Sequence, residues 1–277
     1  MEANPDLDWR DVQDVLVRSS KKIDADTESA DWVTNGAALS HSYWYGFGKV
    51  DALAATTMAA AYDAEHTNVV QAVVTKTQGG DVTIPDADEN GATSVITVTG
   101  EEAAKIRSVE HVNVYLTIDI QRRGDLEITL TGPSGIESLL VPATNDATDD
   151  MTNWRFMTVR HWGEFGTDLA GDWTLHVVDG QSGQTGKLDT WTLNLFGDAA
   201  NGAKTTVKSD EECAENVADN LTWNDVVLGE ACFADFKEAE FTYEDKEEVD
   251  GGDGGAGLGK LSAGVVGAAI ATLVFNL

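Results

Sequence analysis

The sequence predicts a mainly β protein, an antiparallel jelly-roll-like β-sandwich preceded by helices. The clearest observation behind this prediction is the segment 171–197, which reads as two alternating strands joined by a Gly-rich loop. Side chains alternate across a strand, so each of the two carries one apolar row. These rows are Trp173, Leu175 and Val177, then Trp191, Leu193 and Leu195. Two further observations are a series of short strand-like segments before this one and a helical periodicity at the start of the chain.

Residues 1–64 are predicted to be helical. Asp8 can cap a helix over 9–19, in which apolar residues recur at helical spacing. A second helix is predicted to start near Gly48 and to run through Tyr62. A loop rich in Asp, Thr and Asn separates the two helices.

From about residue 68 to residue 197 the apolar period changes to two. The candidate strands are 69–76, 93–99, 109–120, 125–131, 136–142, 155–159, 172–179 and 188–196. The turn signals between them are Gly79-Gly80, Asn90-Gly91, Arg123-Gly124-Asp125 and Pro133-Ser134-Gly135. Short strands separated by regular turns predict an antiparallel sandwich or jelly roll.

Composition sets limits on the class of protein. An apolar content of 42% over 277 residues is enough for a sizeable core, which excludes wholesale disorder. The formal net charge of −30 excludes nucleic acid as a partner, because phosphate contacts require clustered Lys and Arg. The first 30 residues contain no apolar run after a basic start, so no signal peptide is visible in them.

The composition shifts again after Ala199. Residues 205–250 hold 15 Asp or Glu against three Lys, a net charge of 3 − 15 = −12, which predicts an extended acidic stalk. Cys213 and Cys232 match no zinc pattern; they would bridge in an oxidising compartment or remain free thiols. The uncharged run 261–277 is open to three interpretations, a glycolipid-anchor signal, a single membrane span or a buried helix.

Several motifs in the strand-rich part occur in the order found in the P domain (homo B domain) of kexin- and furin-like proprotein convertases, which this part resembles. They are Ile84-Pro85-Asp86, Gly91–Ile96, Ser108–Thr117, Arg122–Leu126, Gly132–Gly135 with Leu139-Leu140, Asn153–Thr158, Trp162-Gly163-Glu164 and a closing hairpin over 171–197. Independent motifs in the right order are a stronger signal than any one of them.

The first 64 residues are similar to the C-terminal end of a subtilisin-like catalytic domain of the same family. The matching motifs are Glu2–Pro5, Trp9–Gln13, Asp31-Trp32, Asn35-Gly36, Ser40–Tyr43 and Tyr45–Gly48. In the family this piece follows the segment with the nucleophilic serine, and the catalytic aspartate and histidine lie further upstream. The resemblance therefore implies that this chain contains none of the catalytic triad.

The resemblance gives a division into four parts. They are 1–64, a remnant of the subtilisin-like domain; 68–199, the P domain; 200–257, the acidic stalk; and 258–277, a hydrophobic end. Residues 1–64 are expected to expose apolar helix faces that normally cover the sheet of an α/β domain. We therefore expect the P domain to be autonomous and residues 1–64 to stand apart from it.

A substitute catalytic site has no support in the sequence. A triad needs a base within hydrogen-bond reach of a nucleophile, and no Gly-x-Ser-x-Gly elbow occurs. The histidines are scattered along the chain: His41, His66, His111, His161 and His176. His41 and His176 lie in aromatic or alternating stretches, where packed or surface roles are expected. No catalytic residue is predicted.

Two loops invite a functional interpretation. Asp86–Gly91 begins like a calcium loop, but Thr97 stands at position twelve, where the bidentate Glu belongs. An ordinary polar loop is therefore expected, and the acidic segment 145–150 could collect a cation by charge alone. Arg123-Gly124-Asp125 has the form of an integrin ligand, but the residue types equally suit a tight turn, which is the interpretation adopted.

The resemblance implies the C-terminal portion of a serine endoprotease that cleaves after basic residues. It further implies that the P domain stabilises the catalytic domain in cis, that calcium is the one cofactor to consider, and that the protein is located in the secretory pathway or at the cell surface, attached to a membrane through its C-terminus. The alternative is a non-catalytic, surface-displayed β-sandwich module that binds carbohydrate or protein.

Overall fold

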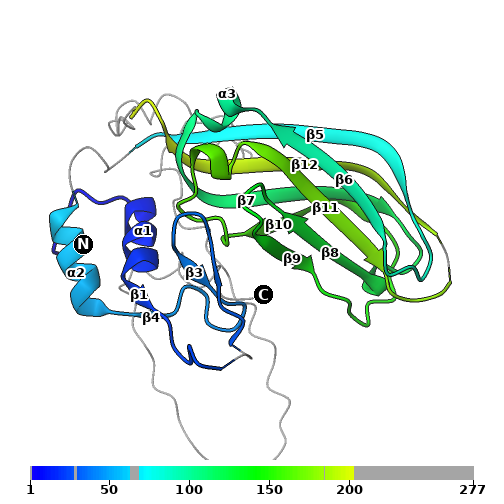
Figure 1. Cartoon of the computed structure of the whole chain (residues 1–277), viewed down its shortest axis with the longest axis horizontal. Helices are drawn as coiled ribbons and strands as arrows, with labels where there is room; N and C mark the ends of the chain where they lie inside the picture. The colour runs from blue at the N-terminus through cyan, green and yellow to red at the C-terminus, as the bar shows by residue number, and fades with distance from the viewer. Residues whose placement is uncertain (1, 28–29, 63–68, 184, 203–277) are drawn as a thin grey trace, which may run out of the picture. The chain divides into compact units, whose positions relative to one another are not determined.

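The computed structural model describes residues 2–27, 30–62, 69–183 and 185–202 (Figure 1). All of them belong to one compact unit, Met1–Asp235. The predictions for His66, for the two cysteines, for the acidic stalk and for the hydrophobic end lie outside the described residues. Within the part of the chain that is described, no helix has the length and apolar character needed to span a membrane.

The strand-rich part is an antiparallel β-sandwich, which confirms the predicted fold class. Its first sheet has the strand order β10-β7-β12-β5 and its second β6-β11-β8-β9 (Figure 1). The strands are β5 (Gln71–Ile84), β6 (Ala92–Val98), β7 (Ile106–Asp119), β8 (Leu126–Thr131), β9 (Glu137–Val141), β10 (Met151–Thr158), β11 (Gly171–Asp179) and β12 (Gly186–Ala199). Three short helices accompany them: α3 (Gly100–Ala103), η2 (Arg123–Asp125) and η3 (Gly166–Asp168).

The apolar rows of β11 and β12 face each other across the core, but the expected closing hairpin is wrong. Trp173 and Leu175 of β11 and Leu193 of β12 are completely buried. β11 pairs with β6 and β8, whereas β12 pairs with β5 and β7, so the two strands lie in different sheets. Alternation shows that a strand has a buried face, and it does not show which strand is its neighbour.

The Gly79-Gly80 signal does not end a strand, which corrects the predicted turn. β5 continues through it, and Gly79 pairs with Thr190 at a point where the register of β12 shifts. Gly80 has φ +145° and Asp81 has φ +49°. Glycine tolerates such angles without cost from a Cβ, so the chain bends here as a bulge and pairing resumes beyond it.

The Asn90-Gly91 turn is formed as predicted, and alanine at position 91 is expected to destabilise the protein. Gly91 has φ +54°, and a Cβ there would lie 2.4 Å from the carbonyl oxygen of Val177. Left-handed strain and this clash with backbone together should lower the free energy of unfolding by more than about 1 kcal/mol. Urea unfolding of Gly91→Ala tests this prediction. Gly100→Ala, with open space and an ordinary φ, is the control, and an equal loss in both variants would contradict it.

In its described residues the N-terminal segment contains two α-helices and two small antiparallel ribbons. The elements are α1 (Trp9–Ser19), β1 (Ser20–Lys21), β2 (Val33–Thr34), β3 (Ser40–His41), β4 (Lys49–Val50) and α2 (Ala52–Ala61). Asp8 caps α1 as predicted, and its side chain accepts from the N–H of Arg10 and of Asp11. α2 begins at Ala52 and not near Gly48, because Asp51 is its cap and the two residues before that pair with β1.

The two helices share a small core of their own and leave other apolar side chains in solvent. Leu7, Val15, Ala55 and Ala59 pack together between them. The exposed large apolar side chains of this segment are Trp9, Leu16 and Leu53 on the helices and Tyr43, Trp44 and Val50 outside them; Trp44 and Leu53 are 77% and 78% exposed. The expected exposure of apolar helix surface is therefore present.

Candidate functional site

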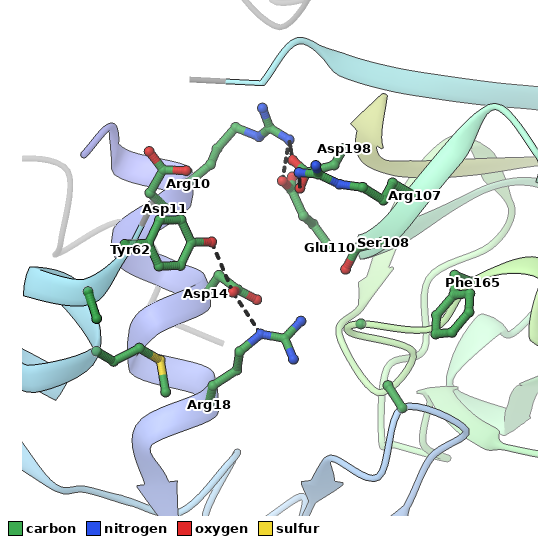
Figure 2. A pocket seen from close by; sticks show the side chains of 14 residues that line it. Arg10, Asp11, Asp14, Arg18, Tyr62, Arg107, Ser108, Glu110, Phe165 and Asp198 are labelled. Carbon is green, nitrogen blue, oxygen red and sulfur yellow. Dashed lines mark hydrogen bonds and ion pairs between the residues drawn. The ribbon is translucent and has the colours of Figure 1, made fainter. Parts of the chain in front are cut away.

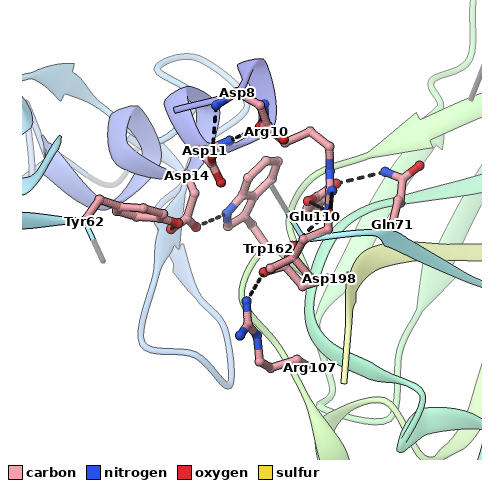
Figure 3. A network of polar contacts seen from close by, with 11 residues as sticks. Asp8, Arg10, Asp11, Asp14, Tyr62, Gln71, Arg107, Glu110, Trp162 and Asp198 are labelled. Carbon is pink, nitrogen blue, oxygen red and sulfur yellow. Dashed lines mark hydrogen bonds and ion pairs between the residues drawn. The ribbon is translucent and has the colours of Figure 1, made fainter. Parts of the chain in front are cut away.

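The N-terminal segment meets the β-sandwich through the buried guanidinium of Arg10. The Asp8 cap fixes the start of α1 and directs Arg10 toward the sandwich (Figure 3). Its Nη2 is ion-paired with Glu110 of β7 and, at 2.8 Å, with Asp198 of β12. Its Nη1 donates to the carbonyl oxygen of Val69. Arg10 is 8% exposed, so a buried side chain of the helix is ion-paired with acids on two strands.

Glu110 and Asp198, the acidic partners of Arg10, each have a second hydrogen-bond partner. Gln71 donates to the second oxygen of Glu110 at 3.0 Å, and Arg107 donates to the second oxygen of Asp198 at 2.8 Å (Figure 3). Burial opposes the charge on Arg10, but the hydrogen bond and charge of Glu110 and the charge of Asp198 prevail and raise its pKa. Burial raises the pKa of the Glu110 carboxyl, and the contacts with Arg10 and Gln71 oppose that rise.

Asp14 forms a second polar contact between α1 and the sandwich. One of its oxygens accepts from the indole N–H of Trp162 at 2.9 Å (Figure 3). The other accepts from Arg18 at 2.7 Å and from the Tyr62 hydroxyl at 3.1 Å. Burial and the charge of Asp14 raise the pKa of Tyr62, so this hydroxyl remains a donor. Asp14 thus connects α1, the residue after α2 and a loop of the sandwich.

The loop Asn35-Gly36 docks on the segment that follows β10. The side-chain amide of Asn35 donates to the carbonyl oxygens of Arg160 and Trp162, at 2.9 and 2.8 Å. The N–H of Gly36 donates to Oε1 of Glu164 at 3.0 Å, and Oε2 of Glu164 lies 2.7 Å from Nδ1 of His161. Neither His161 nor Glu164 has any exposed surface.

Tyr43 covers the edge of the second sheet. Its ring lies 4.1 Å from the guanidinium of Arg160, a cation–π geometry, and its hydroxyl accepts from the N–H of Leu139 on β9. We call the contacts of Arg10, Asp14, Asn35-Gly36 and Tyr43 with the sandwich the junction. The expectation that residues 1–64 stand apart from the sandwich is therefore wrong.

The four described histidines have separate partners and form no shared site. His41 packs edge-on against Phe47, and His111 stacks on Phe196 with ring centroids 4.6 Å apart. His176 contacts the carbonyl oxygen of Asn90 at 2.9 Å, and His161 belongs to the junction. His41 and His176 are packed or at the surface, as the sequence suggested.

In the loop Asp86–Gly91, two carboxylates accept hydrogen bonds from groups within the protein. Asp88 accepts from the backbone and side-chain N–H groups of Asn90, and Asp86 accepts from Gly183. Among the described residues no group of three or more His, Cys, Asp and Glu is placed to hold a metal.

The Arg-Gly-Asp segment is a turn whose charged residues are engaged. Arg123 donates to Asp146 at 2.7 Å and lies over the ring of Trp154, and Asp125 pairs with Arg122 at 3.0 Å. Asp146, from the acidic segment 145–150, is thereby occupied as well. These contacts agree with the turn interpretation adopted for Arg123-Gly124-Asp125.

The free energy of unfolding is expected to fall at acidic pH because of His41 and His111. Burial, together with Arg160 for His41 and with Arg10 and Arg155 for His111, lowers both pKa values to about 4. As the pH falls, the unfolded chain therefore protonates these two histidines before the folded chain does. Their contribution to the free energy of unfolding is fully present above pH 6.5 and is lost as the pH falls toward 4. Each histidine should cost about 1 kcal/mol by pH 5.5. Unfolding at pH 7.5 and 5.5 measures the loss, which His111→Phe should reduce; an undiminished loss in that variant would contradict the assignment.

The sequence of this chain is similar to a known protein family. Residues 109–195 match the family model described as the proprotein convertase P-domain. Human "proprotein convertase subtilisin/kexin type 6" is 37% identical over 207 residues, which are 72% of this chain and 21% of that protein. Human "neuroendocrine convertase 2" is 34% identical over 71% of this chain and 31% of its own length. The chain thus spans less than a third of these two relatives.

A solved structure confirms the fold. The serine protease of Aeromonas sobria superposes with a TM-score of 0.61 over 71% of this chain and 41% of its own, at 23% identity. At that identity the likeness concerns the fold alone. Because it covers 71% of the chain, it extends beyond the residues that the family model matches.

Proposed function

The chain carries a proprotein convertase P domain, and we propose that this domain stabilises a subtilisin-like catalytic domain, of which residues 1–64 are the C-terminal piece. The observation that carries the proposal is the junction. An arginine from the first helix is buried between two acids of the sandwich. Replacing Arg10 or Glu110 alone would leave a buried charge without its main partner, so this ion pair couples the stability of the two parts.

The exposed apolar side chains of the N-terminal segment support the same proposal. Trp44 and Leu53 are more than three-quarters exposed, and Trp9 and Val50 about half. Exposed apolar surface of this extent typically marks an interface. In the proposed arrangement the remainder of the catalytic domain covers it, while the junction holds the opposite side of the segment on the sandwich.

The proposed reaction of the whole protein is peptide-bond hydrolysis after basic residues by a serine endoprotease. The triad residues would lie outside this chain, and the P domain would contribute stability and no reacting group. A net charge of −30 attracts basic substrates at low ionic strength. We further propose a location in the secretory pathway, in keeping with the convertase relatives.

The proposal is tested by joining this chain to a catalytic segment. The chain is fused to a convertase catalytic segment that ends where residue 1 begins, and hydrolysis of a peptide with paired basic residues is followed together with the thermal half-life of activity. We expect activity in the fusion and a half-life that Arg10→Met shortens strongly. Lys187→Ala, which removes an exposed cation paired with Asp189, is the matched control.

Two outcomes would contradict the proposal. One is an active fusion whose half-life is the same with Arg10→Met. The other is an inactive fusion combined with specific retention of the chain on a glycan surface, which would support the alternative of a β-sandwich binding module. Failure of the fusion to fold is separated from both by its circular dichroism spectrum.

A further inference from the structure

A cleft of about 550 Å³ opens beside the junction, between α1 and α2 on one side and the sandwich on the other. Figure 2 shows Asp14, Arg18 and Tyr62 on the helical wall and Arg107, Ser108, Glu110 and Asp198 on the sandwich wall, with the ring of Phe165 beyond them. A volume of this size is within the range of small-ligand sites. The kind of ligand that the cleft could bind depends on which of its polar groups already have hydrogen-bond partners within the protein.

The acceptors that line the cleft are in use. Both oxygens of Asp14, Glu110 and Asp198 accept hydrogen bonds or ion pairs from Trp162, Arg18, Tyr62, Arg10, Gln71 and Arg107. Asp11, the fourth acid of the lining, accepts from the N–H of Asp8 in the capping box. The hydrogen-bonding positions of these acids are therefore occupied, while the lining as a whole carries four carboxylates and three guanidinium groups.

The groups that remain available are donors. Arg18 uses Nε to hold Asp14, and among the described residues neither of its terminal nitrogens has a hydrogen-bond partner. Figure 2 shows these nitrogens directed away from α1, toward the side of the cleft where Phe165 lies. The guanidinium offers its outer edge, a fork that matches the two oxygens of a carboxylate. The Ser108 hydroxyl lines the facing wall as a further donor.

An apolar contact accompanies this donor edge. Phe165 is 59% exposed, and Met58, Ala61 and Ala37 line the same cleft. An exposed aromatic ring and an available guanidinium edge that line the same cleft suit a ligand that combines an anionic head with an apolar body.

We propose that this cleft binds a carboxylate joined to an apolar group, with Arg18 holding the carboxylate and Phe165 the apolar part. The same chemistry occurs in a small aromatic acid and at the C-terminal carboxylate of a peptide ending in an apolar residue. Such a ligand contacts both the N-terminal segment and the sandwich, so it binds the joined form and stabilises the junction by mass action.

The experiment uses the full chain and two matched pairs of probes. One pair is 3-phenylpropanoate and 3-phenylpropanamide; the other is acetyl-Ala-Phe with a free carboxylate and the same peptide as its amide. Binding is followed by NMR titration of the indole N–H of Trp162, the neighbour of Gly163 in the lining, and by thermal unfolding. In the pair that fits, the acid should bind about tenfold more tightly than the amide and raise the melting temperature.

Two variants test the named residues. Arg18→Gln should weaken acid binding about tenfold, whereas Arg122→Gln, an exposed arginine in an equivalent pair with Asp125, should change it less than twofold. Phe165→Ala should weaken both acids and Met157→Ala neither, although the two side chains are equally exposed, at 59% and 57%.

The two pairs of probes distinguish a small aromatic acid from a peptide C-terminus as the ligand, and several results would overturn the proposal. Preference for the small acid or for the peptide acid tells which of the two the cleft accommodates. Equal binding of acid and amide overturns the proposal, as does unchanged affinity in Arg18→Gln or the absence of saturable binding by either acid. Because the comparison of acid with amide uses the unaltered protein, it decides the question even if a variant fails to fold.

Discussion

Replacement of Arg10 by methionine is expected to lower the free energy of unfolding by about 3–5 kcal/mol. The guanidinium is 8% exposed and is ion-paired with both Glu110 and Asp198. Methionine keeps much of the side-chain volume but leaves a buried carboxylate without its main partner. The Asp198 side chain retains Arg107, so the greater part of the loss should come from Glu110.

The measurement is chemical unfolding of the full chain followed by tryptophan fluorescence. A second variant, Arg10→Met with Glu110→Met, removes both charges and should recover much of the loss, because it leaves no isolated buried ion between these two positions. Lys187→Ala, an exposed ion-pair variant, should unfold like the parent protein. A loss in Arg10→Met no larger than in Lys187→Ala would show that the buried ion pair does not stabilise the junction.

Replacement of Glu164 by alanine is expected to have an effect of similar size, about 3–5 kcal/mol. Glu164 is completely buried and holds two groups, the N–H of Gly36 at 3.0 Å and Nδ1 of His161 at 2.7 Å. Alanine would create a cavity, leave the buried Nδ1 of His161 without this partner and remove the acceptor of the part-buried N–H of Gly36. One of them belongs to the N-terminal segment, so the docking of Asn35-Gly36 should weaken as well.

Glutamine at position 164 is the matched control. It has nearly the same shape, and its carbonyl oxygen can still accept from Gly36, so we expect a loss of no more than about 1 kcal/mol. Hydrogen exchange of the Gly36 amide reports the docking directly and should accelerate in Glu164→Ala but not in Glu164→Gln. Unchanged protection of this amide in the alanine variant would contradict the role given to Glu164.

Apart from β5, which was predicted to end at residue 76 and continues to Ile84, the strands of the sandwich could be predicted from the sequence to within a few residues. β6 and β11 show strict alternation, and the structure confirms one buried face for each; the other face is exposed in β6 and mostly half-buried in β11. The Asp8 cap of α1 was equally readable, because capping depends on a carboxylate beside the first turn and on nothing distant. Such signals are local, so a single sequence contains them.

Strand neighbours and the bend at Gly79-Gly80 could not be predicted in the same way. The apolar rows of β11 and β12 have the same pattern whether the strands pair in one sheet or face each other from two sheets. The glycine pair suits a turn and a bulge equally. In each case the choice depends on which partner strand lies alongside, and that is decided by packing.

The junction shows the same division most clearly. Glu110 is a charged residue in a strand with many apolar side chains, the one local sign that a buried partner was needed, but its partner Arg10 lies 100 positions away. The positions of most helices and strands, and the faces that they bury, follow from local sequence, because periodicity and capping act over a few residues. The docking of the N-terminal helices on the sandwich does not, because it depends on charges and hydrogen-bond partners brought together from distant parts of the chain.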